Sequence, residues 1–504
     1  MRLSQLAAAV PGVQVRAGGD HEVWRVVDDS RQARPGDLFV AVRGRHRDGH
    51  SFAPEVAARG VAVALERPVP LPAGTPWLQL REARQDLGEL AAALNGRPAR
   101  RLLTVGVTGT VGKSTTTHMI AHVLESAGLR AGYLSTVAHG VGGRGHANDS
   151  GLTTMGAPEV QSWLARMEAE GAVVAVVECS SHALDQGRVA GCEFDVAAFT
   201  NVGRDHLDYH GSWEAYLAAK ARLIELCARG WAKGIAKTAV LNRDDMSYPY
   251  LAPRPIERRL TYGLGPADVQ AVRLESGDDG SRFDLRTPWG EAEVSLRMPG
   301  RFNVANALCA AAAALALGVE VEQVAAGLSD FPGLRGRLEP VRLGQPFDVY
   351  IDFAHSSIGL ETVLAELRGR LGRDGRLLAV FGATARADHD PAGMGRAAAR
   401  WADFFVITTD DPLAEDPAEL ARQVEAGVEG RQRARDYEVV LDRRAAIRRA
   451  VELARPGDIV LLAGKGHERT LLLAHGPVPW DERVEAESAI REFWPQAVDE
   501  AAER

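Results

Sequence analysis

Short apolar runs alternate with amphipathic stretches along most of the chain. The run 172–177 is apolar at every position, which is typical of a strand buried on both faces of a parallel sheet. Further strands are predicted at 131–137 and 194–200, with helices at 158–170 and 212–227. From residue 334 onward the same alternation predicts strands at 349–353, 377–381, 404–409, 438–441 and 459–463. The pattern therefore predicts an α/β fold built on parallel sheets.

The length of the chain indicates more than one structural unit. With 504 residues it is too long for one hydrophobic core, and about three domains are expected. We place them at residues 1–98, 99–333 and 334–504. In the first unit the pattern predicts strands at 37–42 and 61–65 and a helix at 52–59. The polar groups there that could hold a ligand are Ser30, Arg45, His46 and Arg47, although such loop residues are more often simply solvated.

A glycine-rich turn between a strand and a helix carries the strongest chemical signal. Residues 108–114, TGTVGKS, follow a β-branched run and precede a helical pattern. Such a turn aims successive backbone N–H groups at one point and suits a nucleotide phosphate, although Val107 stands where the usual first glycine is expected. Lys113 would reach the outer phosphates, and the Ser114 hydroxyl would bind Mg²⁺. The residues expected around the phosphates of such a nucleotide are Gly109, Thr110, Val111, Gly112, Lys113, Ser114 and Thr115.

Charged and histidine side chains follow the predicted strands of the second unit. Glu178 ends the run 172–177, and open α/β sheets bind ligands at the carboxyl ends of their strands, so Glu178 is a candidate magnesium ligand. His206 follows the strand 194–200 and could bind metal or shape a substrate pocket, although a lone histidine is usually structural. Lys220 lies on an alanine-rich helix, where a lysine is ordinarily solvated.

Amides and carboxylates mark two further candidate sites. Asn303 and Asn306 share one face of a predicted helix at 303–317 and could hydrogen-bond an adenine edge. The alternative is that Asn303 caps the helix and Asn306 is solvated. In the third unit, the loops after the strands contain Asp352, His355, Asp410, Asp411, Leu413, Gly464 and Glu468. If those strands are parallel, these residues lie at one sheet edge and form a second binding surface.

Composition and charge narrow the class of protein. A formal net charge of −8 gives no general attraction to nucleic acid, so no nucleic-acid partner is expected. The four cysteines show no metal-ligand spacing, which favours a reducing compartment. No run of about 18 apolar residues occurs. We therefore expect no membrane insertion and a cytoplasmic location.

An ordered set of motifs spans nearly the whole chain. They are DSR at 29–31, PGDLFVA at 35–41, TGTVGKST at 108–115, LTT at 152–154, ECSSHALDQGRVAG at 178–191, FTNVGRDHLDYHG at 199–211, PGRFNVANAL at 299–308 and AGKGHE at 463–468. In these motifs the chain resembles the Mur ligases and, among them, the UDP-N-acetylmuramoyl-tripeptide synthetases of the MurE branch. The resemblance implies a three-domain architecture: a UDP-muramoyl-binding domain, a central P-loop ATPase domain with a parallel sheet, and a C-terminal Rossmann-like domain that binds the amino acid. It also implies an ATP-dependent ligase that adds a diamino acid to UDP-N-acetylmuramoyl-L-alanyl-D-glutamate in peptidoglycan synthesis.

The same resemblance implies roles for individual residues. Glu178 and His206 are expected around Mg²⁺, and Lys220 matches the lysine that the family carbamylates into a carboxylate-like metal ligand. The positions that match the shared ATP site are Asn303, Asn306, Arg337 and Asp352. Those that match contacts to the UDP-muramoyl dipeptide are Ser30, Arg45, His46, Arg47, Thr153, Thr154, Ser180, Gln186 and Arg188.

The implied reaction activates a carboxylate before an amine attacks it. ATP would phosphorylate the substrate carboxylate, and the resulting acyl phosphate would react with the amino acid. Lys113, Mg²⁺ and Arg337 would supply the positive charge that the transferring phosphoryl group requires. Asp352 or His355 could remove the proton of the amine.

The loop at 410–413 bears on which amino acid is added. Members of the family that add diaminopimelate have Asp-Asn-Pro-Arg there, and the arginine binds the distal carboxylate. This chain has Asp-Asp-Pro-Leu, in which Leu413 cannot bind a carboxylate and Asp411 favours a distal ammonium. We therefore predict L-lysine or L-ornithine rather than meso-diaminopimelate. The stretches 352–357 and 381–388 also depart from the family pattern, the latter with Ala387 where an arginine is expected and Arg386 beside it.

Other functions are compatible with parts of this pattern. A non-catalytic UDP-sugar-binding homologue would not need the intact Lys113, Glu178, His206 and Lys220. A P-loop switch or motor ATPase usually ends the corresponding strand in aspartate, whereas this strand ends in glutamate. An activity like that of folylpolyglutamate synthetase fits less well, because the DSR and PGDLFVA motifs point to a UDP-muramoyl substrate. We expect a monomer.

Overall fold

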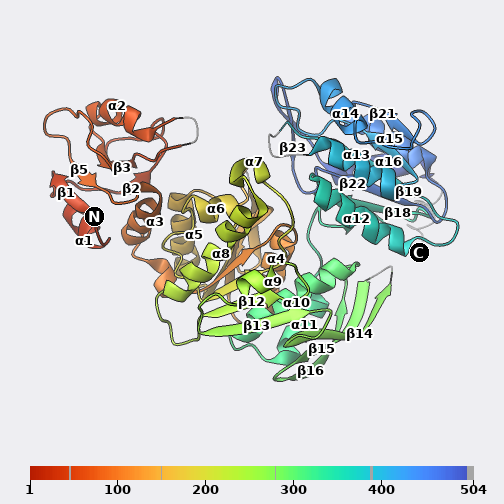
Figure 1. The fold of residues 1–504 in the computed structure, drawn as a ribbon, viewed down its shortest axis with the longest axis horizontal. Coiled ribbons are helices and arrows are strands. Elements are labelled where there is room, and N and C mark those ends of the chain that lie inside the picture. The colour runs from red at the N-terminus through yellow and green to blue at the C-terminus, as the bar shows by residue number, and fades with distance from the viewer. Residues whose placement is uncertain (45–46, 149, 278–279, 386–389, 496–504) are drawn as a thin grey trace.

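Three large β-sheets with their covering helices follow one another along the chain (Figure 1). The computed structural model describes residues 1–44, 47–148, 150–277, 280–385 and 390–495. The unit with the N-terminus lies at one end, the middle of the chain forms the largest sheet, and the last third forms a separate body (Figure 1). The predicted α/β class is confirmed. Among the described residues, no helix is both long and apolar enough to cross a bilayer.

The N-terminal sheet has five strands in the order β1-β5-β4-β3-β2. All neighbouring pairs are parallel except β1 and β5. The predicted strands at 37–42 and 61–65 correspond to β3 and β4, and the predicted helix at 52–59 corresponds to α2. The elements are α1 (Leu3–Ala8), β1 (Gln14–Ala17), β2 (Arg25–Val27), β3 (Asp37–Val40), η1 (Gly49–Phe52), α2 (Ala53–Ala58), β4 (Ala62–Leu65), β5 (Trp77–Gln79), α3 (Ala83–Leu94) and η2 (Pro98–Arg100).

The central unit contains an eleven-stranded sheet. Its first elements are β6 (Leu103–Thr108), α4 (Lys113–Ser126), β7 (Ala131–Leu134), β8 (Ala138–Val141), β9 (Arg144–Ala147), α5 (Ala157–Ala169), β10 (Val174–Glu178), α6 (Ser181–Asp185), β11 (Val196–Phe199), α7 (Leu207–His210) and α8 (Trp213–Arg229). The remainder are β12 (Thr238–Asn242), α9 (Tyr248–Leu251), β13 (Arg258–Gly263), β14 (Val269–Gly277), β15 (Gly280–Thr287), β16 (Gly290–Leu296), α10 (Arg301–Ala316) and α11 (Val321–Asp330).

Parallel strands form the middle of this sheet, and antiparallel strands extend both edges. The parallel part runs β14-β13-β12-β11-β6-β10-β7. Strands β15 and β16 extend one edge and the β8–β9 hairpin the other, and apolar periodicity alone did not predict these additions. Strand β10 is buried at every position, as its apolar run predicts.

The register of β6, β10 and β11 brings the candidate residues together. Glu178 at the end of β10 pairs with Val107 of β6, and Phe199 of β11 pairs with Thr108. The glycine-rich turn leaves β6 at this same sheet edge. Glu178 is therefore placed beside the turn, as expected from the carboxyl ends of parallel strands.

The C-terminal unit has a six-stranded sheet in the order β17-β18-β22-β19-β20-β21. Strands β18 to β22 are all parallel, and β17 is antiparallel to β18. The loops that follow the parallel strands therefore lie at one sheet edge, as a single binding surface requires. A separate hairpin, β23–β24, follows the last parallel strand. The elements are β17 (Glu339–Pro340), β18 (Asp348–Asp352), α12 (Ser357–Arg370), β19 (Leu377–Phe381), α13 (Pro391–Trp401), β20 (Phe404–Ile407), α14 (Pro417–Glu425), β21 (Tyr437–Val439), α15 (Arg443–Leu453), β22 (Ile459–Ala463), β23 (Thr470–Leu473), β24 (Gly476–Pro479) and α16 (Glu482–Phe493).

Candidate active site

The phosphate loop, residues 108–114, depends on two glycines. Gly112 has a φ of +84°, a left-handed conformation that favours glycine, and an added Cβ would lie 2.2 Å from Asn306 Oδ1. A Cβ on Gly109 would lie 1.8 Å from Thr200 Oγ1. Neither position accepts a side chain unless its neighbour moves. The loop is therefore packed directly against β11 and α10.

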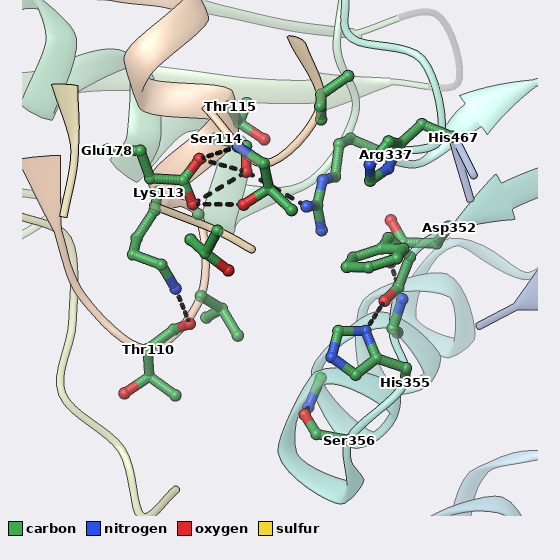
Figure 2. Close-up of a pocket in the computed structure, with 18 of the residues that line it drawn as sticks. Thr110, Lys113, Ser114, Thr115, Glu178, Arg337, Asp352, His355, Ser356 and His467 are labelled. Atoms are coloured by element: carbon green, nitrogen blue, oxygen red, sulfur yellow. Dashed lines mark hydrogen bonds between the residues drawn. The ribbon is translucent and has the colours of Figure 1, made fainter. Parts of the chain in front are cut away.

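Lys113 and Ser114 begin α4 and lie beside Glu178 (Figure 2). Ser114 Oγ donates to Glu178 Oε2 at 3.0 Å. Glu178 also accepts the Thr136 N–H at 2.8 Å and the Thr136 hydroxyl at 3.0 Å. Lys113 Nζ donates to Thr110 O at 2.9 Å, and burial lowers the pKa of Lys113. An ammonium, a hydroxyl and a carboxylate are thus held at the start of one helix.

The carboxylate of Glu178 and the hydroxyl oxygens around it are suitable ligands for a magnesium ion. Glu178 is 1% exposed, and the described partners that hydrogen-bond its carboxylate are all neutral, so a cation would compensate its buried charge. Carboxylate and hydroxyl oxygens are ligands that Mg²⁺ prefers. His206, the third predicted ligand, lines the same cavity, and its Nε2 lies 3.5 Å from Asp205 Oδ2.

Lys220 is buried, so the sequence-based expectation of a solvated lysine is wrong. It is 1% exposed, and its Nζ donates to Gly109 O at 2.6 Å. The Nζ atom lies 4.4 Å from the centre of the Tyr216 ring. Burial, with the charge of Lys113 added to it, holds the pKa of Lys220 well below its usual range. Burial therefore favours the uncharged amine of Lys220.

Asn303 and Asn306 lie near the start of α10 and line the same cavity. The helix begins at Arg301 with Gly300 as its N-cap, so the alternative that Asn303 caps the helix is wrong. Asn306 is only 6% exposed, so the alternative of a solvated side chain is wrong too. Asn306 Nδ2 donates to Asn303 Oδ1 at 3.3 Å, and Asn303 Nδ2 donates to Pro299 O at 2.8 Å.

The C-terminal unit reaches the phosphate loop through Arg337. Its Nη2 donates to Ser114 Oγ at 3.3 Å, and its guanidinium lies 4.7 Å from the centre of the Phe353 ring. Both oxygens of Asp352 accept backbone N–H groups, at 2.7 and 2.8 Å, and burial raises the pKa of Asp352. His355 Nδ1 bonds to Phe353 O at 2.8 Å (Figure 2).

A cavity of about 690 Å³ connects the central and C-terminal units, a volume typical of ligand sites. The predicted residues on its wall are Thr110, Val111, Gly112, Lys113, Ser114, Thr115, Thr153, Glu178, His206, Asn303, Asn306, Arg337, Asp352, His355, Asp411 and Glu468. Gly109 and Lys220 support the phosphate loop without lining the cavity. The structure thus gathers most of the expected nucleotide residues around one space.

Four of the residues predicted to contact the dipeptide form a network beside the cavity. Arg188 Nη1 donates to Thr154 O at 3.0 Å, and its Nε donates to Gln186 Oε1 at 3.0 Å. The Ser180 N–H donates to Thr154 Oγ1 at 3.0 Å. Burial raises the pKa of Asp28 in the N-terminal unit, and the charge of Arg188 opposes that rise. The network therefore lies at the junction of the first two units.

The remaining predicted residues of the N-terminal unit are farther from the cavity wall. Ser30 and Arg47 do not line it. The carbonyl of Ser30 accepts a hydrogen bond from the Arg59 guanidinium. Arg45 and His46 lie outside the described residues.

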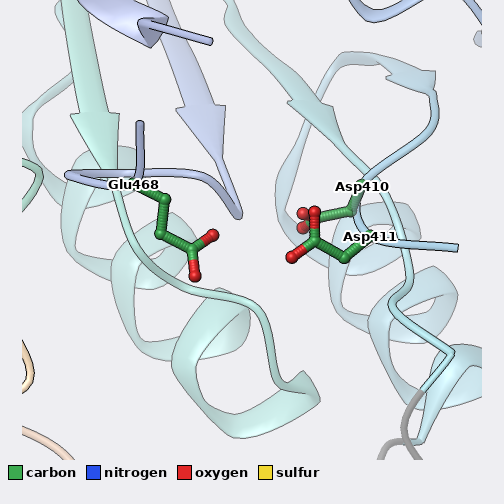
Figure 3. Close-up of side chains that lie close together, drawn as sticks. All are labelled: Asp410, Asp411 and Glu468. Atoms are coloured by element: carbon green, nitrogen blue, oxygen red, sulfur yellow. The ribbon is translucent and has the colours of Figure 1, made fainter. Parts of the chain in front are cut away.

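Asp410, Asp411 and Glu468 form an acidic trio at the C-terminal sheet edge (Figure 3). The buried Lys465 donates to Asp411 Oδ1 at 2.8 Å, lies 2.6 Å from Glu468 Oε2, and lies 3.8 Å from Asp410 Oδ1. Asp410 Oδ2 is buried with no hydrogen-bond partner, and burial raises the pKa of Asp410 to about 7. A Cβ on Gly464 would lie 2.3 Å from that oxygen. The negative charge attributed to Asp411 from the sequence is therefore partly compensated by Lys465.

Leu413 does not line the cavity. It is 40% exposed, and its N–H donates to Leu472 O of the β23–β24 hairpin at 3.1 Å. Its backbone has a φ of +52°, in the left-handed region. Leu413 therefore fixes the hairpin through its backbone and offers no charge to a ligand.

Sequence reasoning missed several residues of the site. Asn201, whose side-chain oxygen accepts the Val111 N–H at 3.1 Å, and Lys465 both lie within motifs, so the motifs contained a signal for them. Thr136 holds Glu178 but stands in no recognisable pattern. His467 lines the cavity, and burial lowers its pKa to about 3.

Comparisons with known proteins match both the central and the C-terminal unit. The Mur ligase middle domain matches residues 107–314, and the Mur ligase, glutamate ligase domain matches residues 336–466. The UDP-N-acetylmuramyl-tripeptide synthetase of Roseiflexus sp. (strain RS-1) is 43% identical over 490 residues, which cover 94% of this chain and 95% of the relative. This chain belongs to the Mur ligase family.

A second relative and a solved structure agree with this assignment. The UDP-N-acetylmuramoyl-L-alanyl-D-glutamate--2,6-diaminopimelate ligase of Geobacillus kaustophilus (strain HTA426) is 39% identical over 500 residues, covering 98% of this Mur ligase and 100% of the relative. A solved structure of an enzyme with that same name is 29% identical, with a TM-score of 0.68, and covers 98% of this chain and 99% of that one. The predicted three-domain Mur ligase architecture and the similarity to the MurE branch are confirmed. The protein is an ATP-dependent ligase of peptidoglycan synthesis.

Proposed function

We propose that this Mur ligase joins a diamino acid to UDP-N-acetylmuramoyl-L-alanyl-D-glutamate while ATP is cleaved to ADP and phosphate. The observation that carries the proposal is the meeting of Lys113, Ser114 and Arg337, with Arg337 Nη2 3.3 Å from Ser114 Oγ. Two cations from different units and the N–H groups of the phosphate loop would surround the transferring phosphoryl group. Its negative charge is stabilised best by cations and hydrogen-bond donors that are positioned before the reaction. The third unit thereby closes the nucleotide site.

We assign one substrate to each of three domains. Residues 1–98 would bind the UDP-muramoyl group, 99–333 ATP, and 334–504 the incoming amino acid. The network around Arg188 supports the first assignment, because it lies where the N-terminal unit meets the phosphate-binding unit. A cavity between the second and third units would exclude water from the activated intermediate.

The reaction would proceed through an acyl phosphate. The γ-phosphoryl group of ATP passes to the carboxylate of the dipeptide, and a new P–O bond replaces the one to ADP. The uncharged amine of the amino acid then attacks the acyl carbon, a C–N bond forms, and phosphate leaves with the electron pair of the C–O bond. We assign receipt of the amine proton to Asp352 or His355, both of which line the cavity.

We also assign a magnesium site to Ser114, Glu178 and His206. When bound, Mg²⁺ would supply positive charge beside the phosphates. Lys220 would add a further carboxylate oxygen after carbamylation, and its lowered pKa supports that modification because the amine must first lose its proton. Without the modification, Lys220 holds the phosphate loop through Gly109 O.

The added amino acid is proposed to be L-lysine or L-ornithine. Leu413 offers no cation to a distal carboxylate, and the carboxylates of Asp411 and Glu468, beside Lys465, could receive a distal ammonium. A second candidate, meso-diaminopimelate, is favoured by the name of the Geobacillus kaustophilus relative, which specifies 2,6-diaminopimelate. The name of the Roseiflexus relative specifies no amino acid.

The proposal is tested by the release of ADP. Purified protein should form ADP from ATP only when the UDP-muramoyl dipeptide and a diamino acid are both present, and it should yield the UDP-muramoyl tripeptide in equal amount. Lys113→Ala should remove this activity while the protein stays folded. If ADP forms at the same rate without the dipeptide, the protein does not catalyse the proposed ligase reaction. Light scattering of the same sample tests our expectation of a monomer.

A further inference from the structure

Arg469 lines the cavity, and its guanidinium has no bonding partner among the described residues. In the described part of the chain, the lysines and arginines that line the cavity are Lys113, Arg337 and Arg469. Lys113 donates to the phosphate loop, and Arg337 donates to the Ser114 hydroxyl. The carbonyl of Arg469 accepts the Trp480 N–H at 2.9 Å, but no described group bonds to its guanidinium. The charge of Arg469 is therefore available to a ligand.

The chain around Arg469 is held firmly against the acidic trio. Arg469 follows Glu468 directly and precedes β23. The Leu472 N–H of that strand donates to Asp411 Oδ1 at 2.9 Å, and Leu472 O accepts the Leu413 N–H at 3.1 Å. These bonds fix the backbone on one side of Arg469, which is exposed and lines the cavity.

The balance of charge at this end of the cavity calls for such a cation. An amino acid brings a carboxylate toward the acidic trio, which lies beside the ammonium of Lys465 and near the guanidinium of Arg443, itself paired with Glu482. Like charges would repel the incoming carboxylate. A guanidinium binds a carboxylate through two parallel N–H···O bonds and would offset that repulsion. Lys113 and Arg337 are already engaged at the phosphate loop.

We propose that Arg469 binds the α-carboxylate of the incoming amino acid while the acidic trio receives its distal ammonium. This inference rests on the proposed function and names the residue that selects the amino acid. One guanidinium serves one carboxylate, so the pocket favours a diamino acid with a single carboxylate. Arg469 is thus a specificity-determining residue that touches substrate, on the hairpin side of the pocket.

The test compares L-lysine with L-lysinamide, which lacks the carboxylate charge. Steady-state ADP release is measured for the wild type, Arg469→Gln and Arg469→Lys. Arg455→Gln serves as control, because Arg455 is an exposed arginine of the same unit that does not line the cavity. We expect Arg469→Gln to raise the KM for lysine by roughly tenfold or more, the usual effect of a lost charged hydrogen bond. The KM for lysinamide, ATP and dipeptide should stay unchanged.

The outcomes separate this inference from the proposed function. Arg469→Lys should keep part of the preference for lysine over lysinamide, and Arg455→Gln should keep all of it. If Arg469→Gln prefers lysine over lysinamide as strongly as the wild type does, Arg469 does not bind the carboxylate. If instead the wild type releases no ADP with either compound, the ligase proposal itself fails. Matching melting temperatures of the wild type and Arg469→Gln would show that a changed KM does not reflect misfolding.

Discussion

Replacement of Gly112 by alanine tests how the phosphate loop fits against α10. Gly112 has a φ of +84°, and an added Cβ would lie 2.2 Å from Asn306 Oδ1. Gly128, just after α4, has a φ of +81° and no atom within 4 Å of an added Cβ. Both alanines therefore incur the same left-handed strain, and only Gly112→Ala adds a collision. Gly128→Ala is the matched control.

The size of the effect follows from these contacts. The left-handed backbone costs about 1–2 kcal/mol at either position. The collision forces the Asn306 amide to move, which breaks its contacts to Asn303 Oδ1 at 3.3 Å and Thr116 Oγ1 at 3.5 Å. Each lost hydrogen bond is worth about 1 kcal/mol. Gly112→Ala should lower the free energy of unfolding by about 3–4 kcal/mol, against about 1–2 kcal/mol for Gly128→Ala.

Melting temperature and the KM for ATP measure the two consequences separately. Gly112→Ala should raise the KM for ATP by roughly tenfold or more, because about 1.4 kcal/mol of lost contact corresponds to that factor. Gly128→Ala should leave the KM unchanged. The double variant Gly112→Ala/Asn306→Ala lacks the same two Asn306 contacts, so its melting temperature and its KM for ATP should stay close to those of Gly112→Ala. Equal KM values for the two single variants would refute the reasoning.

Three further predictions concern other parts of the site. Leu413→Arg should increase the use of meso-diaminopimelate relative to lysine, measured as ADP release with each amino acid; no change would show that this position does not face the distal group. Asp410→Asn should gain stability relative to the wild type as pH rises from 3.8 to about 7, because in this range the folded wild type retains a proton that the unfolded chain has released. Urea denaturation at several pH values measures the difference in the free energy of unfolding between the two proteins. A difference that does not change with pH would contradict the prediction. Lys220→Met should reduce the rate by roughly 10–100-fold, as loss of a group that supports metal binding does. Carbon-13 NMR with labelled bicarbonate should show a carbamate signal in the wild type that is absent from Lys220→Met, and a wild type without that signal would exclude the modification.

Local patterns in the sequence determined the phosphate loop and the carboxylate beside it. The strand before residues 108–114, the glycines within them and the helix after them were enough to predict a phosphate loop. The apolar run that ends in Glu178 was enough to place a carboxylate beside that loop, and β10 is buried throughout, as predicted. These inferences succeed because backbone conformation and strand burial depend on residues close together in the chain.

Tertiary structure decided which charges are buried and which remain available. Lys220 looked solvated on its helix, but the fold places its Nζ against Gly109 O, more than a hundred positions away in the chain. The sequence predicts a negative charge at Asp411, and the fold places the ammonium of Lys465 against it. Arg337 and Ser114 meet only because two units close on one cavity. The pKa of a side chain and its ion pairs depend on the groups packed around it. Those groups come from distant segments of the chain, which no local pattern identifies.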